Sequence, residues 1–333
     1  MRTVTRDARS ATVLATVCAL VMVLAGCGVT RGDQANDLLM IIPNSPGGGY
    51  DLTGRDAVQV LEDNDITDGD ITVQNIVGAG GAVAMTELVG RVGEERTLMT
   101  VGLGVVGSTY SFGSPFGLTD ATPIAQLMSE PEGVLVPGDS PFKTIDDLLE
   151  AWKADPGSLA VGGGSSPGGP DHLFPMQLAA EVGIDPNDVN YVTYDGGGPL
   201  TSALLGKKID AGFSGLPEFE GSITSGDLRV LAVSGEERYP EGSPFADAPT
   251  LVEKDVDLVF LNWRGVLAPP DLSDTRREEL IGYFEEMHET PQWQQVVEEN
   301  GWNDDFKTGE EFGDFIREQD QRVSGTLEEL GLL

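Results

Sequence analysis

Two short glycine-rich turns, each placed between an apolar run and an amphipathic stretch, constrain the fold of this chain most. The turn 46–51 follows the apolar run 38–42, and the turn 78–81 follows the run 71–76. Strand, turn and helix in that order, given twice, favour an α/β architecture. Glycine lets the backbone approach a ligand closely, and the helix that follows adds the positive end of its dipole. Two such turns on neighbouring strands would form a paired anion site without a basic side chain.

The same alternation continues along most of the chain. Strands are predicted at 38–42, 71–76, 97–101, 133–136, 159–161, 189–193, 209–213, 228–233 and 258–263, with a mixed segment up to 124–128; helices are predicted at 51–62, 82–92, 145–154, 171–182, 199–205, 217–225, 273–289, 291–300 and 309–330. Thr144–Asp147 resembles a capping box, and Trp293, Phe312 and Phe315 are expected in the core. We therefore expect two α/β domains with mainly parallel sheets.

The domain boundaries follow from the same pattern. Residues 37–136 are predicted to form the first part of domain 1, and residues 137–250 to form domain 2. Residues 251–333 would cross back and pack mainly on domain 1. Hinges are expected near Pro137 and near 248–257, where the chain passes between the domains.

The N-terminal residues are typical of an export signal. Positive charges at Arg2, Arg6 and Arg9 precede an apolar stretch, 11–24, that is short for a membrane span. The sequence Leu-Ala-Gly-Cys at 24–27 fits a lipobox. We predict a signal peptide at 1–26, lipidation of Cys27 and a tether at 27–36, which would anchor the protein on the outer face of the cell membrane. An ordinary cleaved signal or an uncleaved anchor is the alternative.

Charge and residue counts exclude several classes of function. The chain has 20 Lys and Arg against 55 Asp and Glu, a net charge of −35, so nucleic-acid binding is excluded. Its two cysteines, Cys18 and Cys27, both lie in the N-terminal segment, and its only histidines are His172 and His288. These counts support no disulfide, no metal site and no cofactor.

Three candidate features have both a structural and a functional interpretation. Gly102–Gly107 matches GxGxxG, but no acidic residue follows at the right place and 108–115 does not look helical, so a flexible loop facing the cleft is expected. His172 begins a helix after a glycine-rich loop; a structural role is favoured over ligand contact. Asp51 is expected to cap the helix behind the first turn, and Tyr50 can offer its hydroxyl or ring to a ligand.

The order of motifs resembles the Bug-type extracytoplasmic solute receptors of tripartite tricarboxylate transporters. The matching segments are 46–51, 78–81, 165–173, 194–199, 204–206, 209–210, 226–233 and 263–269. The resemblance implies a two-domain fold of the periplasmic-binding-protein (Venus flytrap) type, with crossing strands and the ligand between the domains.

The resemblance also implies a set of ligand contacts. The first two turns would grip a carboxylate through backbone N–H groups, and the second domain would meet the other end of the ligand. The predicted ligand-binding residues are Gly47, Gly48, Gly49, Tyr50, Gly78, Ala79, Gly80 and Gly81 from the first domain, and Ser165, Ser166, His172, Tyr194, Gly196 and Gly197 from the second. Asp195 stands where many relatives have a basic residue, which argues against a strongly anionic distal group on the ligand.

The sequence therefore predicts a monomeric, lipid-anchored receptor that is not an enzyme. It would capture a small carboxylate, a di- or tricarboxylate or related organic acid, for integral-membrane transporter subunits. Two alternatives remain: a receptor that presents its ligand to a sensor or partner protein, and an exported enzyme that uses the same cleft with His172 as the base.

Overall fold

A mixed β-sheet with helices packed around it forms the body of the protein. The computed structural model describes residues 36–194 and 196–333. The described strands are β1 (Leu38–Ile42), β2 (Ile71–Asn75), β3 (Thr97–Gly102), β4 (Thr122–Pro137), β5 (Ala160–Gly163), β6 (Asn190–Thr193), β7 (Ala211–Gly215), β8 (Leu228–Val233), β9 (Leu261–Ala268) and β10 (Lys307–Thr308). Their order is β2-β1-β3-β9-β4-β7-β5-β6, and β8 and β10 each pair with β4.

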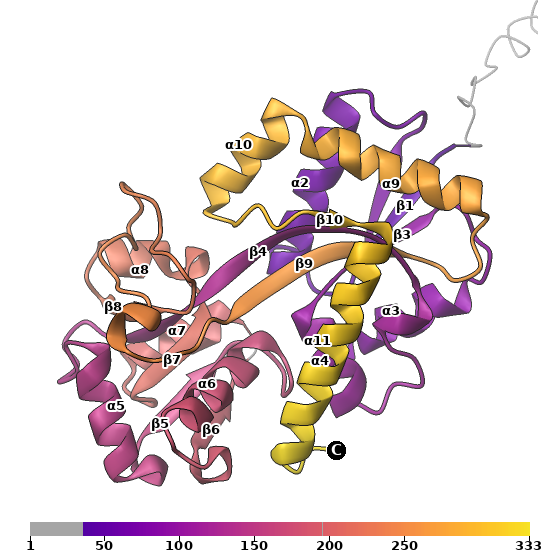
Figure 1. Ribbon diagram of the computed structural model, residues 1–333. Helices are drawn as coiled ribbons and strands as arrows, with labels where there is room; N and C mark the ends of the chain where they lie inside the picture. The colour runs from indigo at the N-terminus through magenta and orange to yellow at the C-terminus, as the bar shows by residue number, and fades with distance from the viewer. Residues whose placement is uncertain (1–35, 195) are drawn as a thin grey trace, which may run out of the picture. The chain divides into compact units, whose positions relative to one another are not determined.

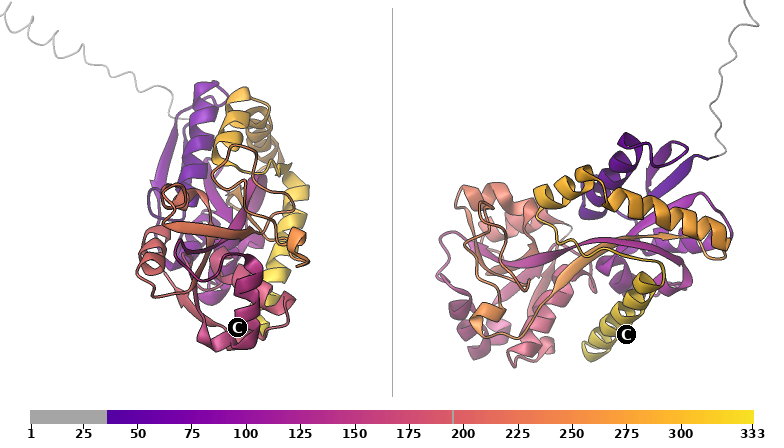
Figure 2. Two further views of the ribbon diagram at one scale, coloured as in Figure 1. Left: turned by 90° about the vertical axis from the view of Figure 1, so that its left-hand side faces the viewer. Right: turned by 45° about the horizontal axis from the view of Figure 1, so that its top comes forward.

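The helices follow most of the strands. They are α2 (Gly49–Asp63), α3 (Ala82–Gly90), α4 (Leu103–Ser111), α5 (Ile145–Ala154), α6 (Pro170–Glu181), α7 (Gly197–Leu205), α8 (Glu220–Thr224), α9 (Asp274–His288), α10 (Pro291–Asn300) and α11 (Gly309–Glu329). Helices α9 and α10 lie on one side of the β4–β9 pair and α11 on the other (Figures 1 and 2). The predicted α/β fold class is confirmed.

The crossing strands β4 and β9 join two groups of strands (Figure 1). One group has parallel pairs of β1 with β2 and β3, and the other has parallel pairs of β5 with β6 and β7. All pairs made by β4 and β9 are antiparallel, so the sheet as a whole is mixed. Residues 37–333 form one compact unit, and the boundaries of two domains within it stay a prediction.

Strand β4 is longer than the sequence predicted. It runs unbroken over 16 residues, where we expected a mixed segment and a separate strand at 133–136. The sequence Glu130-Pro131-Glu132 interrupts the apolar pattern and hides the continuity. Pro131 pairs with Leu261 of β9, and the next residue pairs with Gly215 of β7. Proline, which has no N–H to donate, therefore stands where β4 changes partner, and both flanking glutamates are buried.

Helix α4 corrects a second expectation. The GxGxxG segment was predicted to be a flexible loop, but residues 103–111 form a helix that starts directly after β3. Two glycines and three β-branched residues give this segment a low intrinsic helix propensity. The helix is held by tertiary contacts: Leu103, Val105 and Val106 are almost fully buried, and the Tyr110 hydroxyl donates to an Asp320 carboxylate oxygen of α11 at 2.8 Å.

The core confirms the predicted buried aromatics. Trp293 and Phe312 are fully buried, and Phe315 packs against the same apolar cluster as Phe312. That cluster also contains Met99 behind the first glycine turns and Phe213 of β7, so one apolar core continues across the crossing strands. The two groups of strands are thus held together by shared packing as well as by β4 and β9.

The predicted signal segment 1–26 and Cys27 lie outside the described residues, and their roles stay predictions. Within 36–194 and 196–333, no helix is both long and apolar enough to cross a membrane.

The predicted capping box at the start of α5 is confirmed. The Thr144 hydroxyl accepts a hydrogen bond from the Asp147 N–H at 3.2 Å, and an Asp147 carboxylate oxygen accepts from the Thr144 N–H at 2.9 Å. Replacing Thr144 with alanine removes the first of these bonds, and we expect a loss of about 1 kcal/mol in unfolding free energy. Urea denaturation measures this loss. Thr119→Ala, at an exposed turn, is the control and should change stability by less than about 0.5 kcal/mol; equal effects of the two variants would contradict the prediction.

Candidate functional site

The two glycine turns lie side by side, as the sequence predicted. Strands β1 and β2 are parallel neighbours with Ile42 opposite Asn75, so both turns leave the same edge of the sheet. The Asn75 side-chain amide donates to the Asn44 carbonyl at 2.9 Å. A β-carbon added at Gly81 would lie 3.1 Å from Pro43 Cβ. The segments next to the two turns therefore touch, and Gly81 has little room for a larger residue beside Pro43.

The second turn has a backbone that only a glycine-rich sequence adopts easily. Gly78, Ala79, Gly80 and Gly81 all have positive φ, at 152°, 46°, 60° and 105°. Side chains beyond glycine are strained in this region, so the sequence of the turn follows from its shape. Successive left-handed residues turn backbone N–H groups toward a common side, which is a known way to bind an anion.

Asp51 holds the first turn in place. Its carboxylate accepts hydrogen bonds from the Gly47 N–H at 2.8 Å, from the Asn75 side-chain amide at 2.8 Å and from the Arg55 guanidinium at 2.9 Å. Burial alone would raise the pKa of Asp51, but the hydrogen bonds from Arg55, Asn75 and Gly47 outweigh burial and hold the pKa below its usual value. The Asp51 carboxylate therefore braces the first turn, but its amide partner, the Gly47 N–H, lies before α2, and the predicted role of Asp51 as a cap of that helix stays a prediction.

Replacing Asp51 with asparagine should destabilise the protein by about 1–3 kcal/mol at pH 7, because an amide NH₂ would then face one of three donors. The folded pKa of Asp51 is depressed, so its stabilising contribution is present above the unfolded-state pKa of about 3.9 and is lost as the pH falls through the folded pKa. The difference between the two proteins should therefore shrink below about pH 4. Urea denaturation across pH tests this; Asp63→Asn, exposed at the other end of α2, is the control. A difference that grows in acid would contradict the prediction.

The first turn uses part of its own hydrogen-bonding capacity. The Gly47 N–H goes to Asp51 and the Gly48 N–H to the Ser45 carbonyl at 3.3 Å. The N–H groups of Gly49 and Tyr50 open helix α2, and N–H groups in the first turn of a helix have no intrahelical acceptor. The amides that can meet a ligand are thus those of Gly49 and Tyr50 rather than those of Gly47 and Gly48.

Tyr50 connects the first turn to helix α4. Its hydroxyl oxygen accepts a hydrogen bond from the Val105 N–H at 3.2 Å, and a β-carbon added at Gly104 would lie 2.8 Å from the same oxygen. Burial raises the pKa of Tyr50 to about 12, against the opposing charge of Arg264. The phenol stays protonated and can donate its own hydrogen to a ligand. The start of α4 therefore adjoins the candidate site, where the sequence predicted a loop rather than a helix.

The loop before α6 closes over α4. The Ser111 hydroxyl donates to the Pro167 carbonyl at 2.8 Å. A β-carbon added at Gly107 would overlap the Gly168 carbonyl, so the two backbones lie closer than any other residue at 107 would allow. A β-carbon at Gly80 would lie 2.7 Å from Ser108 Cβ and 3.5 Å from the Ser166 hydroxyl. The structure thus brings the predicted Ser166 to the second glycine turn.

Ser165 and His172 shape this loop. The Ser165 hydroxyl accepts from the Asp171 N–H at 3.1 Å, and His172 Nδ1 accepts from the Gly168 N–H at 3.2 Å. The His172 ring also packs edge-on against Tyr191, with ring centroids 4.9 Å apart. Burial lowers the pKa of His172 to about 4, so the ring is neutral at physiological pH. These contacts give His172 the structural role that the sequence favoured, and ligand contact by either residue stays a prediction.

The remaining predicted residues of the second group have partners within the protein. Tyr194 packs on an apolar cluster, where a β-carbon at Gly162 would lie 3.0 Å from its ring. The Gly196 N–H donates to the Gly164 carbonyl at 2.8 Å, and the Gly197 N–H donates to the Glu218 carboxylate at 3.2 Å. Asp195 lies outside the described residues. The Gly197 N–H, which was predicted to meet the ligand, is therefore already hydrogen-bonded to an acidic side chain of the protein.

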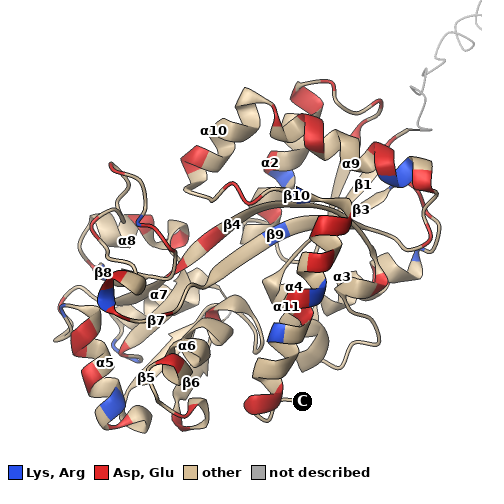
Figure 3. Ribbon diagram, in the orientation of Figure 1, with Lys and Arg blue, Asp and Glu red and all other residues tan. Residues whose placement is uncertain are grey.

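A buried set of charges lies on the crossing strands, and the sequence did not single it out. Arg264 of β9 forms an ion pair with Glu130 of β4, and the Asn262 side-chain amide donates to the same carboxylate at 3.3 Å. Figure 3 shows acidic residues on β4 beside a basic residue on β9. A β-carbon at Gly49 would lie 2.5 Å from an Arg264 guanidinium nitrogen. The buried arginine therefore touches the first residue of α2, directly behind the first glycine turn.

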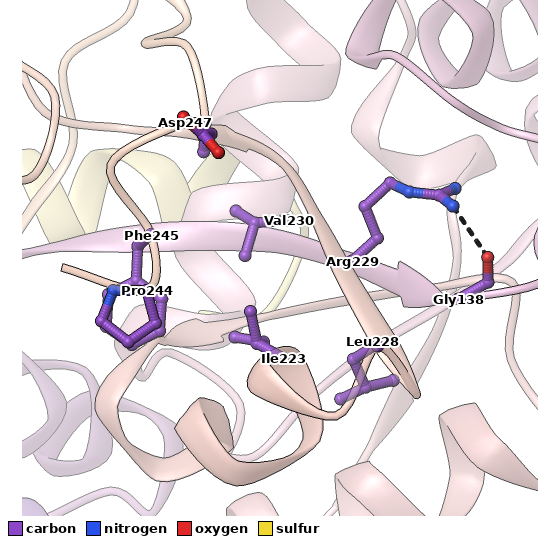
Figure 4. Close-up of a pocket in the computed structure, with 10 residues that line it drawn as sticks. Gly138, Ile223, Leu228, Arg229, Val230, Pro244, Phe245 and Asp247 are labelled. Carbon is purple, nitrogen blue, oxygen red and sulfur yellow. Dashed lines mark hydrogen bonds between the residues drawn. The ribbon is translucent and has the colours of Figure 1, made fainter. Parts of the chain in front are cut away.

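A separate hollow lies at the far end of β4, away from the glycine turns. This cavity of about 360 Å³ is bordered by β8, α8 and the segment 244–248 (Figure 4). Arg229, on its wall, donates to the Gly138 carbonyl at 2.8 Å. None of the predicted ligand-binding residues lines this cavity, so it is not part of the candidate site. It adjoins both segments where hinges are predicted.

Comparisons with known proteins agree with this architecture. BugT of Bordetella pertussis is 26% identical over 310 residues, which cover 89% of this chain and 90% of BugT. Among solved structures, Rpa4515 of Rhodopseudomonas palustris, determined with adipate, superposes with a TM-score of 0.76 at 19% identity, over 89% of this chain and 97% of that protein. MatC of Rhodopseudomonas palustris, determined with bound malate, gives a TM-score of 0.72 at 19% identity, over 87% and 99% of the two chains.

Residues 61–332 match the family described as the tripartite tricarboxylate transporter family receptor. The match begins within α2 and covers strands β2 to β10 with helices α3 to α11, and the predicted resemblance is thereby confirmed. The chain belongs to the tripartite tricarboxylate transporter receptor family of solute-binding proteins.

Proposed function

We propose that this protein is an extracytoplasmic receptor that captures a small carboxylate and delivers it to integral-membrane transporter subunits. The observation that carries the proposal is the neighbouring position of the two glycine turns, one at the start of α2 and the other directly before α3. The positive ends of both helices and the N–H groups of the turns meet there, an arrangement suited to one carboxylate. Structural neighbours determined with malate and with adipate support this ligand class.

Binding and closure, without any chemical step, form the proposed mechanism. One carboxylate of the ligand would lie at the turns and accept from the N–H groups of Gly49 and Gly80 and from the Tyr50 hydroxyl. The loop of Ser165 and Ser166 would close over it, with bending near Pro137 and 248–257. His172 Nδ1 is occupied by the Gly168 N–H, which favours a binding site over an enzyme with His172 as its base. Lipidation at Cys27 would keep the receptor beside the membrane.

Isothermal calorimetry against a carboxylate panel tests the proposal. The panel contains malate, succinate, adipate, citrate, glutarate and the amino acids aspartate and glutamate. We expect at least one of these to bind, and Gly80→Val to abolish that binding, because a valine would fill the space between Ser108 and Ser166. Gly90→Val, where an added β-carbon meets nothing within 4 Å, is the matched control. The proposal would be overturned if no member of the panel bound, or if the Gly80→Val variant bound the ligand as tightly as the original protein.

A further inference from the structure

Glu132 is a buried acid whose carboxylate has no hydrogen-bond partner in the described part of the chain. The residue is fully buried on β4, and both of its carboxylate oxygens are without a hydrogen-bond partner among the described residues. Buried polar groups in folded proteins are nearly always hydrogen-bonded, so an unpartnered carboxyl group needs a specific explanation. An apolar residue at position 132 would give a more stable folded protein, so the carboxyl group is expected to have a role other than stability.

The surroundings of Glu132 are acidic. Glu130 lies two residues away on the same face of β4, and burial, followed by the charges of Asp171 and Glu130, raises the pKa of Glu132 well above its usual value. Arg264 opposes this rise, but its guanidinium is already paired with Glu130. The charged and titratable groups that act on Glu132 are Asp171 of α6, Glu130 of β4, Arg264 of β9 and Glu218 next to α8, and Tyr191 and Tyr239 are in turn affected by it.

Glu132 belongs to the same region as the glycine turns. Arg264 links Glu130 to Gly49 at the first turn. Asp171 follows the loop that meets Gly80, and its carboxylate accepts from the Gly164 N–H at 2.8 Å. Burial raises the pKa of Asp171 to about 6, against hydrogen bonds from Ser214 and Gly164 that lower it. Glu130 thus adjoins the first turn through Arg264, Asp171 adjoins the loop that meets Gly80, and both acids act on Glu132.

We propose that the ligand of this receptor carries a cationic nitrogen as well as a carboxylate, and that Glu132 receives the ammonium group. This inference rests on the proposed function and names the ligand class. A ligand with a second carboxylate in this region would find three acids, Glu130, Glu132 and Asp171, and one arginine that is already paired with Glu130, so this set of residues offers its negative charge no free positive partner. An ammonium group supplies the missing donors to Glu132 while the glycine turns hold the carboxylate.

Matched pairs of ligands test the inference by calorimetry. The pairs are aspartate with succinate, glutamate with glutarate, and 5-aminovalerate with valerate; within each pair the amino group is the main difference. We expect the amino member of at least one pair to bind at least 30-fold more tightly than its partner. Glu132→Gln should weaken that amino ligand at least 30-fold and change the binding of its partner less than 3-fold. Glu150→Gln, on the exposed face of α5, is the control and should leave both unchanged.

Proton release gives a second, independent measurement. Burial and the neighbouring acids raise the pKa of Glu132, and an arriving ammonium group would lower that pKa again by favouring the charged carboxylate. Calorimetry in two buffers of different ionisation enthalpy should therefore show net proton release when the amino ligand binds, and less release in Glu132→Gln. Tighter binding of succinate or glutarate than of the amino partners would overturn this inference and leave the carboxylate receptor standing. A panel in which nothing binds would overturn the proposed function with it.

Discussion

Replacing Gly107 with alanine is expected to weaken ligand binding at least 100-fold while the receptor stays folded. The backbone of α4 at Gly107 lies against the Gly168 carbonyl so closely that an added β-carbon would overlap it. The obstacle is backbone on both sides, so no side-chain rotation relieves it. The loop that carries Ser165, Ser166 and Gly168 would have to withdraw from α4, and with it the proposed cover of the ligand.

The fold should survive this change because the strain is confined to one contact. The overlap involves only the backbone of Gly168, and alanine is a better helix former than glycine by about 1 kcal/mol. Calorimetry with the tightest ligand of the panel measures the loss of binding, and thermal unfolding measures the fold. Gly282→Ala, inside α9 with open space around it, is the control and should leave affinity unchanged. Undiminished affinity in Gly107→Ala would show that helix α4 and the loop containing Gly168 are not in contact when ligand is bound.

Regular elements with a clear apolar pattern could be predicted from the sequence closely. Strands β1 and β8 and helix α10 have the predicted bounds, and the capping box at Thr144 is present as expected. These elements depend on local information: apolar periodicity, caps and turn residues. The neighbouring position of the two glycine turns followed from the same logic, because parallel strands bring their carboxyl ends to one edge.

Helix α4 and strand β4 could not be predicted because their stability comes from distant partners. The glycines of α4 lower its helix propensity, yet Gly104 and Gly107 are where Tyr50 and Gly168 approach. In β4, Pro131 looks like a strand terminator but marks the change of partner from β9 to β7. In both segments, residues that argue against the element locally are the ones its tertiary contacts require.

The buried charges were missed for a similar reason. A role beside the first glycine turn could be proposed for Asp51 because Asp51 is next to that turn in the sequence. Glu130 and Arg264, in contrast, are more than a hundred residues apart and meet only in the folded chain. One signal was available: an arginine inside the run 258–268 and two glutamates inside 124–136 interrupt stretches that are otherwise rich in apolar residues. Charges at such positions are rarely buried unless they are paired or serve a site.

Replacing Arg264 with methionine is expected to lower the unfolding free energy by about 3–5 kcal/mol. Arg264 is 8% exposed and Glu130 5% exposed, so removing the guanidinium leaves a carboxylate buried beside Glu132. The Glu130 carboxylate then remains buried without a counter-charge, and nothing offsets the free-energy cost of removing it from water. Urea denaturation at pH 7 measures the loss. Arg238→Met is the matched control: its ion pair with Glu253 is exposed on both sides, so its removal should change the unfolding free energy far less than the removal of Arg264.

The double variant Arg264→Met with Glu130→Gln separates the charge from the packing. If an unpaired buried carboxylate causes the loss, neutralising Glu130 should restore most of it, since replacing a whole buried pair is often close to neutral. If shape causes the loss, because Arg264 fills the space beside Gly49 and Tyr50, the double variant should be as unstable as the single one. If the unfolding free energy of Arg264→Met stays within 1 kcal/mol of the original, both the charge explanation and the shape explanation are contradicted. If the double variant regains stability but not ligand affinity, the Arg264 guanidinium has a second role. It then supports the first glycine turn in the conformation that binds the ligand.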